Sequence, residues 1–318
     1  MEKVYFETSA FNYLLKSIRF ESFLNTRELQ RRRGRQLFVS PVTLWEAMLT
    51  GKDPDFLLFA AQNLFSEQML AAPSEIIVRY LLNAYPENKV NYKIFTDLEL
   101  GNIWGRMAHD NSVTFEYDKE KLREKTKFLR SISTNLSSIV KYPTITPTDP
   151  NLQGVANIVH TYYECLYDDG FLPKSEGKRY DLEILYKLFV LIVLVFFILR
   201  LDLDSGVIED FWRNVGLAEN DQTKRMMYIF EKYPELLKRG PLLEITIMAY
   251  HQLQLGRKNR GLIIDSFHMI YAPYVDTIIS ADQDFSELRS QEKHYSRKLV
   301  HVSEINLRET PFISRSSS

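Results

Sequence analysis

Short β-prone runs alternate with helix-like segments at both ends of this 318-residue chain, but not in its middle. Near the N-terminus, the apolar runs 4–6 and 37–39 flank a segment whose apolar residues have helical spacing. Near the C-terminus, the runs 275–280 and 299–302 follow a helix-like stretch at 262–271. Strands that alternate with helices are typical of a mostly parallel, doubly wound sheet. The pattern therefore predicts an α/β domain assembled from the two ends of the chain.

The middle of the chain lacks this alternation and favours helices. Three prolines fall within residues 143–150, where they break any helix or central strand and indicate an exposed connection. At roughly 150 residues per domain, the length suits two domains, or one domain with a large insertion. Residues 1–75 and 240–305 together have the size of an ordinary domain. We therefore expect residues 76–239 to form a mainly helical insertion and residues 306–318 to form a flexible tail.

Composition excludes several classes of protein. Hydrophobic residues make up 45% of the chain and charged residues 25%, so the chain can build a core and is neither disordered nor collagen-like. Its single cysteine excludes a disulfide scaffold and predicts a reducing compartment, most simply the cytoplasm. The net charge is −1, without the basic excess typical of proteins that wrap nucleic acid. A nucleic-acid ligand would therefore be contacted transiently, at one site.

One apolar run, residues 188–199, raises the question of a membrane. Twelve residues form a helix of about 18 Å, whereas the hydrocarbon core of a bilayer is about 30 Å thick. Lys187 and Arg200 flank the run. At the N-terminus, acids within the first residues argue against a signal peptide. The run therefore predicts no membrane span. We expect a buried core helix, or a lid, dimer interface or docking site for a protein partner.

Four acids follow predicted strands or lie in the helices after them. These acids are Glu7, Glu46, Asp265 and Asp282. In an open α/β sheet, ligands bind at the carboxyl ends of the strands, so these side chains are expected to converge. Carboxylates that lie close together repel one another, and a hard divalent cation relieves that cost. Such a cation can activate water and bind phosphate for in-line attack.

The order of these residues resembles the PIN-domain family. Residues 4–14 resemble its opening motif, an apolar strand followed by an acid and Thr or Ser. Residues 40–46 resemble the second motif, in which a helix carries one Glu, and residues 265–270 resemble the third, an acid that opens a helical stretch. Residues 277–285 are similar to the fourth and most specific motif, a strand that ends in Ser-Ala-Asp-Gln-Asp-Phe. The resemblance covers the two ends of the chain and says nothing about its middle.

The resemblance implies a fold, an activity and a cofactor. PIN-like proteins have a three-layer α/β fold and are metal-dependent nucleases, usually acting on RNA. A nuclease of this kind would hydrolyse phosphodiester bonds in RNA or single-stranded nucleic acid and leave 5′-phosphates, with Mg²⁺ or Mn²⁺ as cofactor. By this resemblance the catalytic and metal-ligating residues are Glu7, Glu46, Asp265 and Asp282, with Asp284 as an accessory metal ligand.

One position departs from the family pattern. The family's first acid is normally Asp, whereas this chain has Glu7. The longer side chain moves the carboxylate, and Mg²⁺ sites tolerate little change in geometry. The alternative function is therefore a catalytically impaired PIN-like binding or regulatory protein that acts through its helical insertion. A toxin-like nuclease held by an inhibitor is a third interpretation.

Each acid also has an ordinary structural interpretation. Glu7 can be a surface acid after an edge strand, Glu46 an exposed helix position, and Asp265 a side chain that hydrogen-bonds to a turn. Asp282 and Asp284 can be plain loop acids.

The remaining candidates are polar residues near the four acids. The basic turn 257–260 suits phosphate contacts beside Asp265, although a solvated charge cluster has the same composition. His268 lies three residues after Asp265 on the same helical face, where it contacts phosphate or is buried and hydrogen-bonded. Asp276 either approaches the site or pairs with a neighbouring Arg, and the Arg-rich run 31–35 is expected at the end opposite the acids. The predicted substrate-binding residues are Thr8, Ser9, Arg257, Lys258, Arg260, His268 and Ser280.

Overall fold

The structure is a computed structural model that describes most of the chain. The described residues are 1–49, 51–65, 68–84, 95–97, 113–141, 146–168, 181–199, 205–217, 221–232, 240–255, 262–291 and 295–305. The chain divides into two units, which we call the sheet unit and the helical unit. The sheet unit comprises Met1–Leu70, Phe95–Trp104 and Val275–Ser318, and the helical unit comprises Ala71–Ile94 and Gly105–Tyr274.

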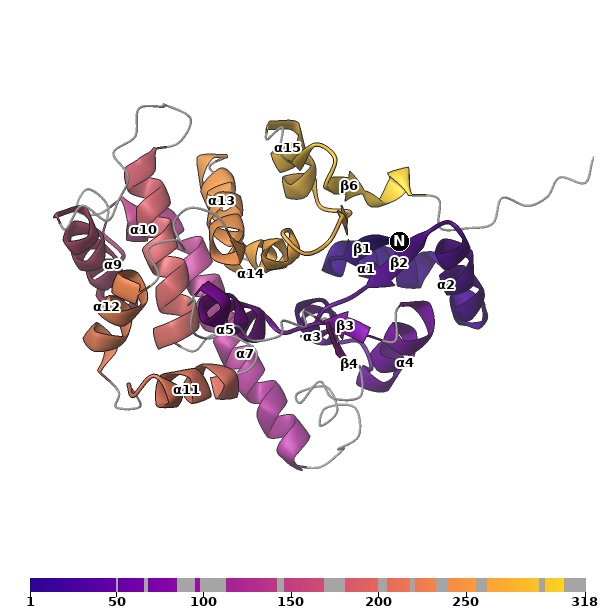
Figure 1. The fold of residues 1–318 in the computed structure, drawn as a ribbon, viewed down its shortest axis with the longest axis horizontal. Helices are drawn as coiled ribbons and strands as arrows, with labels where there is room; N and C mark the ends of the chain where they lie inside the picture. Colours follow the sequence, from indigo (N-terminus) through magenta and orange to yellow (C-terminus); the bar gives the residue numbers. More distant parts are fainter. Residues whose placement is uncertain are drawn as a thin grey trace, which may run out of the picture. The chain divides into compact units, whose positions relative to one another are not determined.

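A four-stranded parallel sheet lies at the centre of the sheet unit (Figure 1). Its strands, in spatial order, are β2 (Arg35–Phe38), β1 (Glu2–Phe6), β5 (Thr277–Ser280) and β6 (Leu299–His301). Val4 pairs with Leu37 on one side and with Thr277 on the other. Both central strands are largely buried, as expected for a parallel sheet covered on both faces. The predicted α/β fold with a parallel sheet built from both ends of the chain is confirmed.

Helices and a short antiparallel pair of strands accompany this sheet in the sheet unit. The helices are α1 (Thr8–Ser17), η1 (Phe20–Ser22), α2 (Phe23–Arg32), α3 (Pro41–Leu49), α4 (Pro54–Leu64), α15 (Gln283–Gln291) and η7 (Val302–Glu304). Strand β3 (Gln68–Leu70) pairs antiparallel with β4 (Phe95–Asp97). In the core, the ring of Phe65 lies 5.5 Å from that of Phe6 and 5.6 Å from that of Phe11. These contacts hold α1 and the end of α4 against β1.

All described elements of the helical unit are helices, as the sequence predicts for the middle of the chain (Figure 1). They are α5 (Pro73–Ala84), α7 (Val113–Thr134), α8 (Leu136–Val140), α9 (Pro150–Asp168), α10 (Leu182–Val193), the π-helix η3 (Leu194–Ile198), α11 (Ser205–Asn214), α12 (Gln222–Lys232), α13 (Pro241–Gln254), α14 (Leu262–Phe267) and η5 (His268–Tyr271).

The boundary between the units differs from the predicted division. Residues 71–75 and 240–274 were assigned to the sheet domain by sequence, but they lie in the helical unit. Helix α13 packs against α10, and α14 packs against α7, so the segment that leads to β5 belongs with helices that are distant in sequence. The predicted tail 306–318 lies outside the described residues.

The apolar run forms α10 and η3 in the core of the helical unit. Side chains 188–198 are at most 8% exposed. The ring of Phe196 lies 4.8 Å from that of Phe267, and Trp212 Nε1 donates a hydrogen bond of 3.2 Å to the Phe197 carbonyl oxygen. The predicted buried helix is confirmed, and its apolar side chains are covered within the unit. No described helix is long and apolar enough to cross a membrane.

Candidate functional site

The candidate site begins where β1 and β5 end side by side. Phe6 and Ile279 are partners in the parallel register, and the Glu7 N–H donates to the Ile279 carbonyl oxygen at 3.1 Å. Glu7 follows the last residue of β1, and Ala281 follows the last residue of β5. The polar residues after both strands therefore lie at the carboxyl edge of the sheet, where ligands of α/β proteins bind.

Glu7 caps the first helix and joins the two strand ends. Its side chain is 4% exposed and accepts hydrogen bonds from Ser9 N (2.7 Å), Ala10 N (2.9 Å) and the Ser9 hydroxyl. Ala281 N donates a shared hydrogen bond to Ser9 Oγ (2.9 Å) and Glu7 Oε1 (3.3 Å). A carboxylate offers about four acceptor positions. Three of these four donors bond to Oε1 and one to Oε2, and together they make Glu7 an N-cap and a tie between β1 and β5.

Glu46 reaches the same edge from α3. Thr8, the first residue of α1, donates its hydroxyl hydrogen bond to Glu46 Oε2. Glu46 is half-buried, whereas Trp45 and Ala47 on either side of it are buried. Helices α1 and α3 pack together, so the hydrogen bond links two neighbouring helices. Glu46 is therefore connected to Glu7 through Thr8.

A buried hydroxyl network positions α3 against β1. The Tyr5 hydroxyl lies 2.8 Å from Ser40 Oγ and 3.1 Å from Thr43 Oγ1, and Thr43 Oγ1 donates to the Phe6 carbonyl oxygen at 2.9 Å. Sequence reasoning missed Tyr5 and Thr43 as supporting residues. A Tyr in the middle of a buried strand was the available signal, because a buried phenol needs a hydrogen-bond partner.

Asp282 and Asp284 occupy the second junction, between β5 and α15. Asp282 N donates to Ser280 Oγ at 2.8 Å, and Asp284 N donates to Asp282 Oδ1 at 3.1 Å. Asp282 thus caps α15 and is half-buried, whereas Asp284 is only 2% exposed. Ser280 is buried at the end of the strand. The sheet unit therefore brings together seven of the predicted residues, which are Glu7, Thr8, Ser9, Glu46, Ser280, Asp282 and Asp284.

Asn12 is an additional residue near this group. It lies one helical turn after Thr8, on the same face of α1. Its Oδ1 is buried and accepts no hydrogen bond from the described part of the chain. An amide oxygen is a suitable ligand for a hard cation or a water molecule. The four-residue spacing from Thr8 could have identified Asn12 from the sequence.

The other predicted residues lie in the helical unit or outside the described residues. Asp265 is half-buried in α14, and His268 is 1% exposed in η5, both in the helical unit. Arg257, Lys258 and Arg260 lie outside the described residues.

The amino edge of the sheet holds the remaining charged candidates. Asp276 precedes β5, and its Oδ2 accepts a hydrogen bond of 2.7 Å from Lys3 N. Asp276 therefore belongs to the edge opposite the candidate site. The Arg-rich run also lies at that edge, where Arg35 pairs with Glu2 at 3.0 Å. The predicted position of the run, opposite the acids, is confirmed.

The acids at the carboxyl edge do not form a closed metal cage. Among the residues that the structure describes, no group of three or more His, Cys, Asp or Glu side chains is arranged to hold a metal ion. Glu7 Oε1 already accepts three hydrogen bonds, and Oε2 accepts one. Mg²⁺, however, is commonly held by one or two carboxylates, with water and substrate phosphate completing its shell. Glu46 and Asp282 suit that open kind of site, because both are half-buried at the edge.

Comparisons with known proteins found no relative of this chain. No protein-family model, no curated protein and no solved structure matches it.

Proposed function

We propose that this chain is a divalent-metal-dependent nuclease of the PIN type that hydrolyses phosphodiester bonds in RNA or single-stranded nucleic acid. The observation that carries the proposal is the hydrogen-bonded group at the carboxyl edge of β1 and β5. It joins the first, second and fourth motifs of the resemblance in one unit, at the edge of a parallel sheet where ligands bind.

The proposal gives the residues different roles. Glu46 and Asp282 are the carboxylates that would hold Mg²⁺ or Mn²⁺, and such an ion would polarise the phosphate and activate water. Thr8 is a positioning residue, because its hydroxyl fixes one oxygen of Glu46. Glu7 is also a positioning residue, because its carboxylate holds Ser9 and Ala281 in place. Asp265, the acid of the third motif, enters the proposal through the resemblance alone.

A second candidate is a PIN-like protein that binds nucleic acid without cleaving it. Two observations favour this function. The carboxylate of Glu7 accepts hydrogen bonds from four donors, and the described residues include no three-ligand metal group. A protein with these properties would retain the scaffold and lose the reaction.

Cleavage and binding assays on the full chain distinguish the two functions. Labelled RNA and single-stranded DNA are incubated with the purified protein in Mn²⁺, Mg²⁺ or EDTA. The variants are Asp282→Asn, Glu46→Gln and Asp265→Asn. Asp276→Asn is the matched control, because it makes the same chemical change on the opposite edge of the sheet.

The nuclease proposal expects cleavage that requires the cation, that is lost in Asp282→Asn and Glu46→Gln, and that persists in Asp276→Asn. The effect of Asp265→Asn reports directly on the third motif. Binding of the same nucleic acids without cleavage in any cation supports the second candidate. A folded protein that neither binds nor cleaves them contradicts both.

A further inference from the structure

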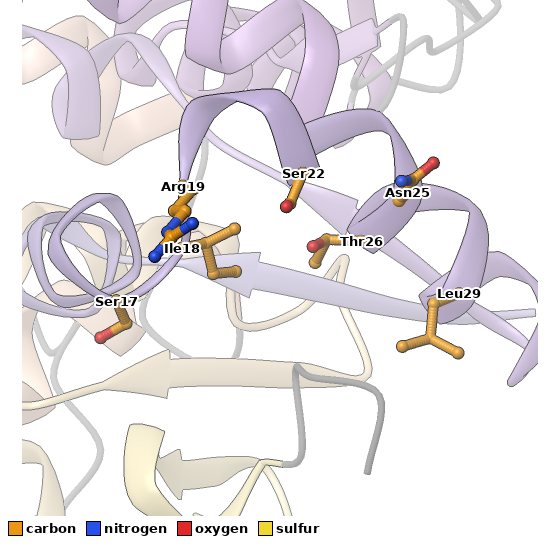
Figure 2. A pocket seen from close by; sticks show the side chains of 7 residues that line it. All are labelled: Ser17, Ile18, Arg19, Ser22, Asn25, Thr26 and Leu29. Atoms are coloured by element: carbon orange, nitrogen blue, oxygen red, sulfur yellow. The ribbon is translucent and has the colours of Figure 1, made fainter. Parts of the chain in front are cut away.

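A separate pocket lies at the far end of α1 from Thr8. Helix α1 has ten residues, so its two ends are about 15 Å apart. The pocket has a volume of about 240 Å³ and lies between the end of α1 and one face of α2 (Figure 2). The residues that line it are Ser17, Ile18, Arg19, Ser22, Asn25, Thr26 and Leu29.

The α2 side of the pocket is a polar helix face. Ser22, Asn25, Thr26 and Leu29 have i, i+3, i+4 and i+7 spacing, so they share one side of the helix. Such spacing normally carries apolar side chains toward a core. Here three of the four residues are polar, and exposed Arg32 follows Leu29 by three residues on the same side. This face is suited to a polar ligand.

Thr26 is the most informative residue of the pocket. Its side chain is 7% exposed, and within the described part of the chain its hydroxyl makes no hydrogen bond. In Figure 2 the hydroxyl points toward the Ser22 hydroxyl and the end of α1. Ser22 precedes α2 without forming a side-chain cap. Two hydroxyls that open onto one space can donate to and accept from a ligand with hydrogen-bonding atoms.

The charge of the pocket selects the kind of ligand. Arg19 lines the pocket, is exposed, and pairs with no acid among the described residues. None of the described lining residues is acidic, and nearby Glu21 does not line the pocket. The carboxyl end of α1 and the amino end of α2 both border the space, so their helix dipoles oppose each other and the side chains decide the preference. The Arg19 guanidinium, the hydroxyls of Ser22 and Thr26 and the Asn25 amide suit an oxygen-rich anion.

We infer that this pocket binds a backbone phosphate of a single-stranded nucleic acid, away from the reaction centre. The inference deepens the proposed function, because it assigns a substrate contact to the same unit. A water molecule occupies about 30 Å³ of liquid, so the pocket has the space of about eight waters. That space accommodates a phosphate group with part of its ribose. The phosphate contact supplies affinity and positions the strand, and it carries no base preference.

The first experiment measures RNA affinity by fluorescence anisotropy over a series of salt concentrations, in EDTA so that no metal-dependent cleavage occurs. Arg19→Gln is expected to weaken binding about tenfold and to reduce the slope of log affinity against log salt by about 0.7, the value for one phosphate contact on a single strand. Thr26→Val is expected to weaken binding about 2- to 10-fold without changing the slope, because it removes a hydroxyl and no charge.

Matched variants separate a ligand contact from damage to the fold. Thr26→Ser keeps the hydroxyl and is expected to bind as the wild type does. Lys16→Gln removes an exposed cation in the last turn of α1 that does not line the pocket, and is expected to leave the salt slope nearly unchanged. Equal losses in Thr26→Ser and Thr26→Val, or unchanged affinity in both Arg19→Gln and Thr26→Val, would overturn the inference.

A second arm distinguishes nucleic acid from free phosphate. Inorganic phosphate is titrated while the midpoint of thermal unfolding is followed, in the wild type and in Thr26→Val. Sensitivity of RNA binding to Arg19 and Thr26 supports the inference, and stabilisation by phosphate alone overturns it in favour of a free-anion pocket. Asp282 does not line the pocket, so the variant Asp282→Asn tests the nuclease reaction without altering the phosphate contact. RNA binding that depends on Arg19 but never leads to metal-dependent cleavage rejects the nuclease and retains the phosphate pocket.

Discussion

The sheet unit and the helical unit both bury charged side chains, but in different settings. In the sheet unit, Glu7 and Asp284 lie where strands end, and the Glu7 carboxylate contacts backbone N–H groups and a serine hydroxyl. In the helical unit, Lys187 pairs with Glu183 on the same helix and lies 5.0 Å from the ring of Tyr163. Arg225 donates to the Leu217 carbonyl oxygen at 3.1 Å and lies 5.2 Å from the ring of Trp212.

This difference distinguishes charged side chains that can bind a ligand from charged side chains that stabilise the fold. The buried acids Glu7 and Asp284 of the sheet unit lie near hydroxyls at the carboxyl edge, which is where parallel sheets bind ligands. The buried cations Lys187 and Arg225 of the helical unit each contact a hydrogen-bonding partner and an aromatic ring, so they have the contacts that buried charges need. We therefore expect substitutions of Glu46 and Asp282 to change activity, and substitutions of Lys187 and Arg225 to change stability.

The largest effect is expected for Asp282→Asn. Loss of the carboxylate charge should lower metal-dependent cleavage at least about 100-fold. The free energy of unfolding should change by no more than about 1 kcal/mol, because the Asn side chain can still cap α15. Cleavage rates and urea unfolding of the same preparation measure both quantities. A folded Asp282→Asn protein with wild-type cleavage would remove Asp282 from the site.

The next effect is the loss of stability expected for Arg225→Ala in the helical unit. The substitution leaves the Leu217 carbonyl oxygen without its donor, removes the contact with Trp212 and opens a cavity, so the free energy of unfolding should fall by about 2–4 kcal/mol. Cleavage per folded molecule should be unchanged. Arg213→Ala is the matched control, because its ion pair with Asp210 is exposed and is worth about 0–1 kcal/mol. Reduced cleavage in a fully folded Arg225→Ala protein would contradict the expectation that Arg225 affects stability only.

A substitution of Glu7 tests whether a buried acid of the sheet unit also stabilises the fold. In Glu7→Gln an amide NH₂ replaces one acceptor oxygen, so buried N–H donors of α1 lose their partner and the free energy of unfolding should fall by about 1–3 kcal/mol. Glu21→Gln, an exposed change in the same unit, should have little effect. Unaltered stability with lost cleavage would show that Glu7 acts on the substrate or the cation, and not as a cap.

Much of the fold follows from local patterns in the sequence. The runs that became β1, β2, β5 and β6 are short, apolar and bounded by helix signals, so their existence was predictable. The boundary of the helical unit was not, because residues 240–274 join that unit through contacts of α13 and α14 with α10 and α7. Contacts between segments that are distant in sequence cannot be predicted from the local spacing of apolar residues.

The candidate site was predictable in part for the same reason. The position of Asp282 after a buried strand identified it, and strand order then placed it beside Glu7. The role of Glu7 was harder to predict, because Asp, Asn, Ser and Thr are the usual N-cap residues and Glu is not. The phosphate pocket was missed entirely. It depends on the approach of α1 and α2 at Arg19 and Thr26, and neither residue belongs to any motif.

The smallest effect concerns the pH response of the helical unit. His160 is buried, and its Nε2–H donates to the Ile139 carbonyl oxygen at 2.9 Å. Burial, and then the charge of Lys187, lower the pKa of His160 from its ordinary value of 6.5. The unfolded chain therefore binds this proton more readily than the folded chain. The stabilisation from the neutral imidazole is complete above that ordinary value and is lost as the pH falls through and below it.

This sign gives a measurable difference between two variants. The free energy of unfolding is followed by urea denaturation from about pH 8 to about pH 5, the range in which His titrates. His160→Gln should reduce the pH dependence by less than about 1.4 kcal/mol per pH unit, the limit for one proton. His301→Gln is the matched control, because His301 is half-buried in the sheet unit at the end of β6. Equal pH dependence in the wild type and His160→Gln would show that the imidazole binds its proton equally well in the folded and the unfolded chain.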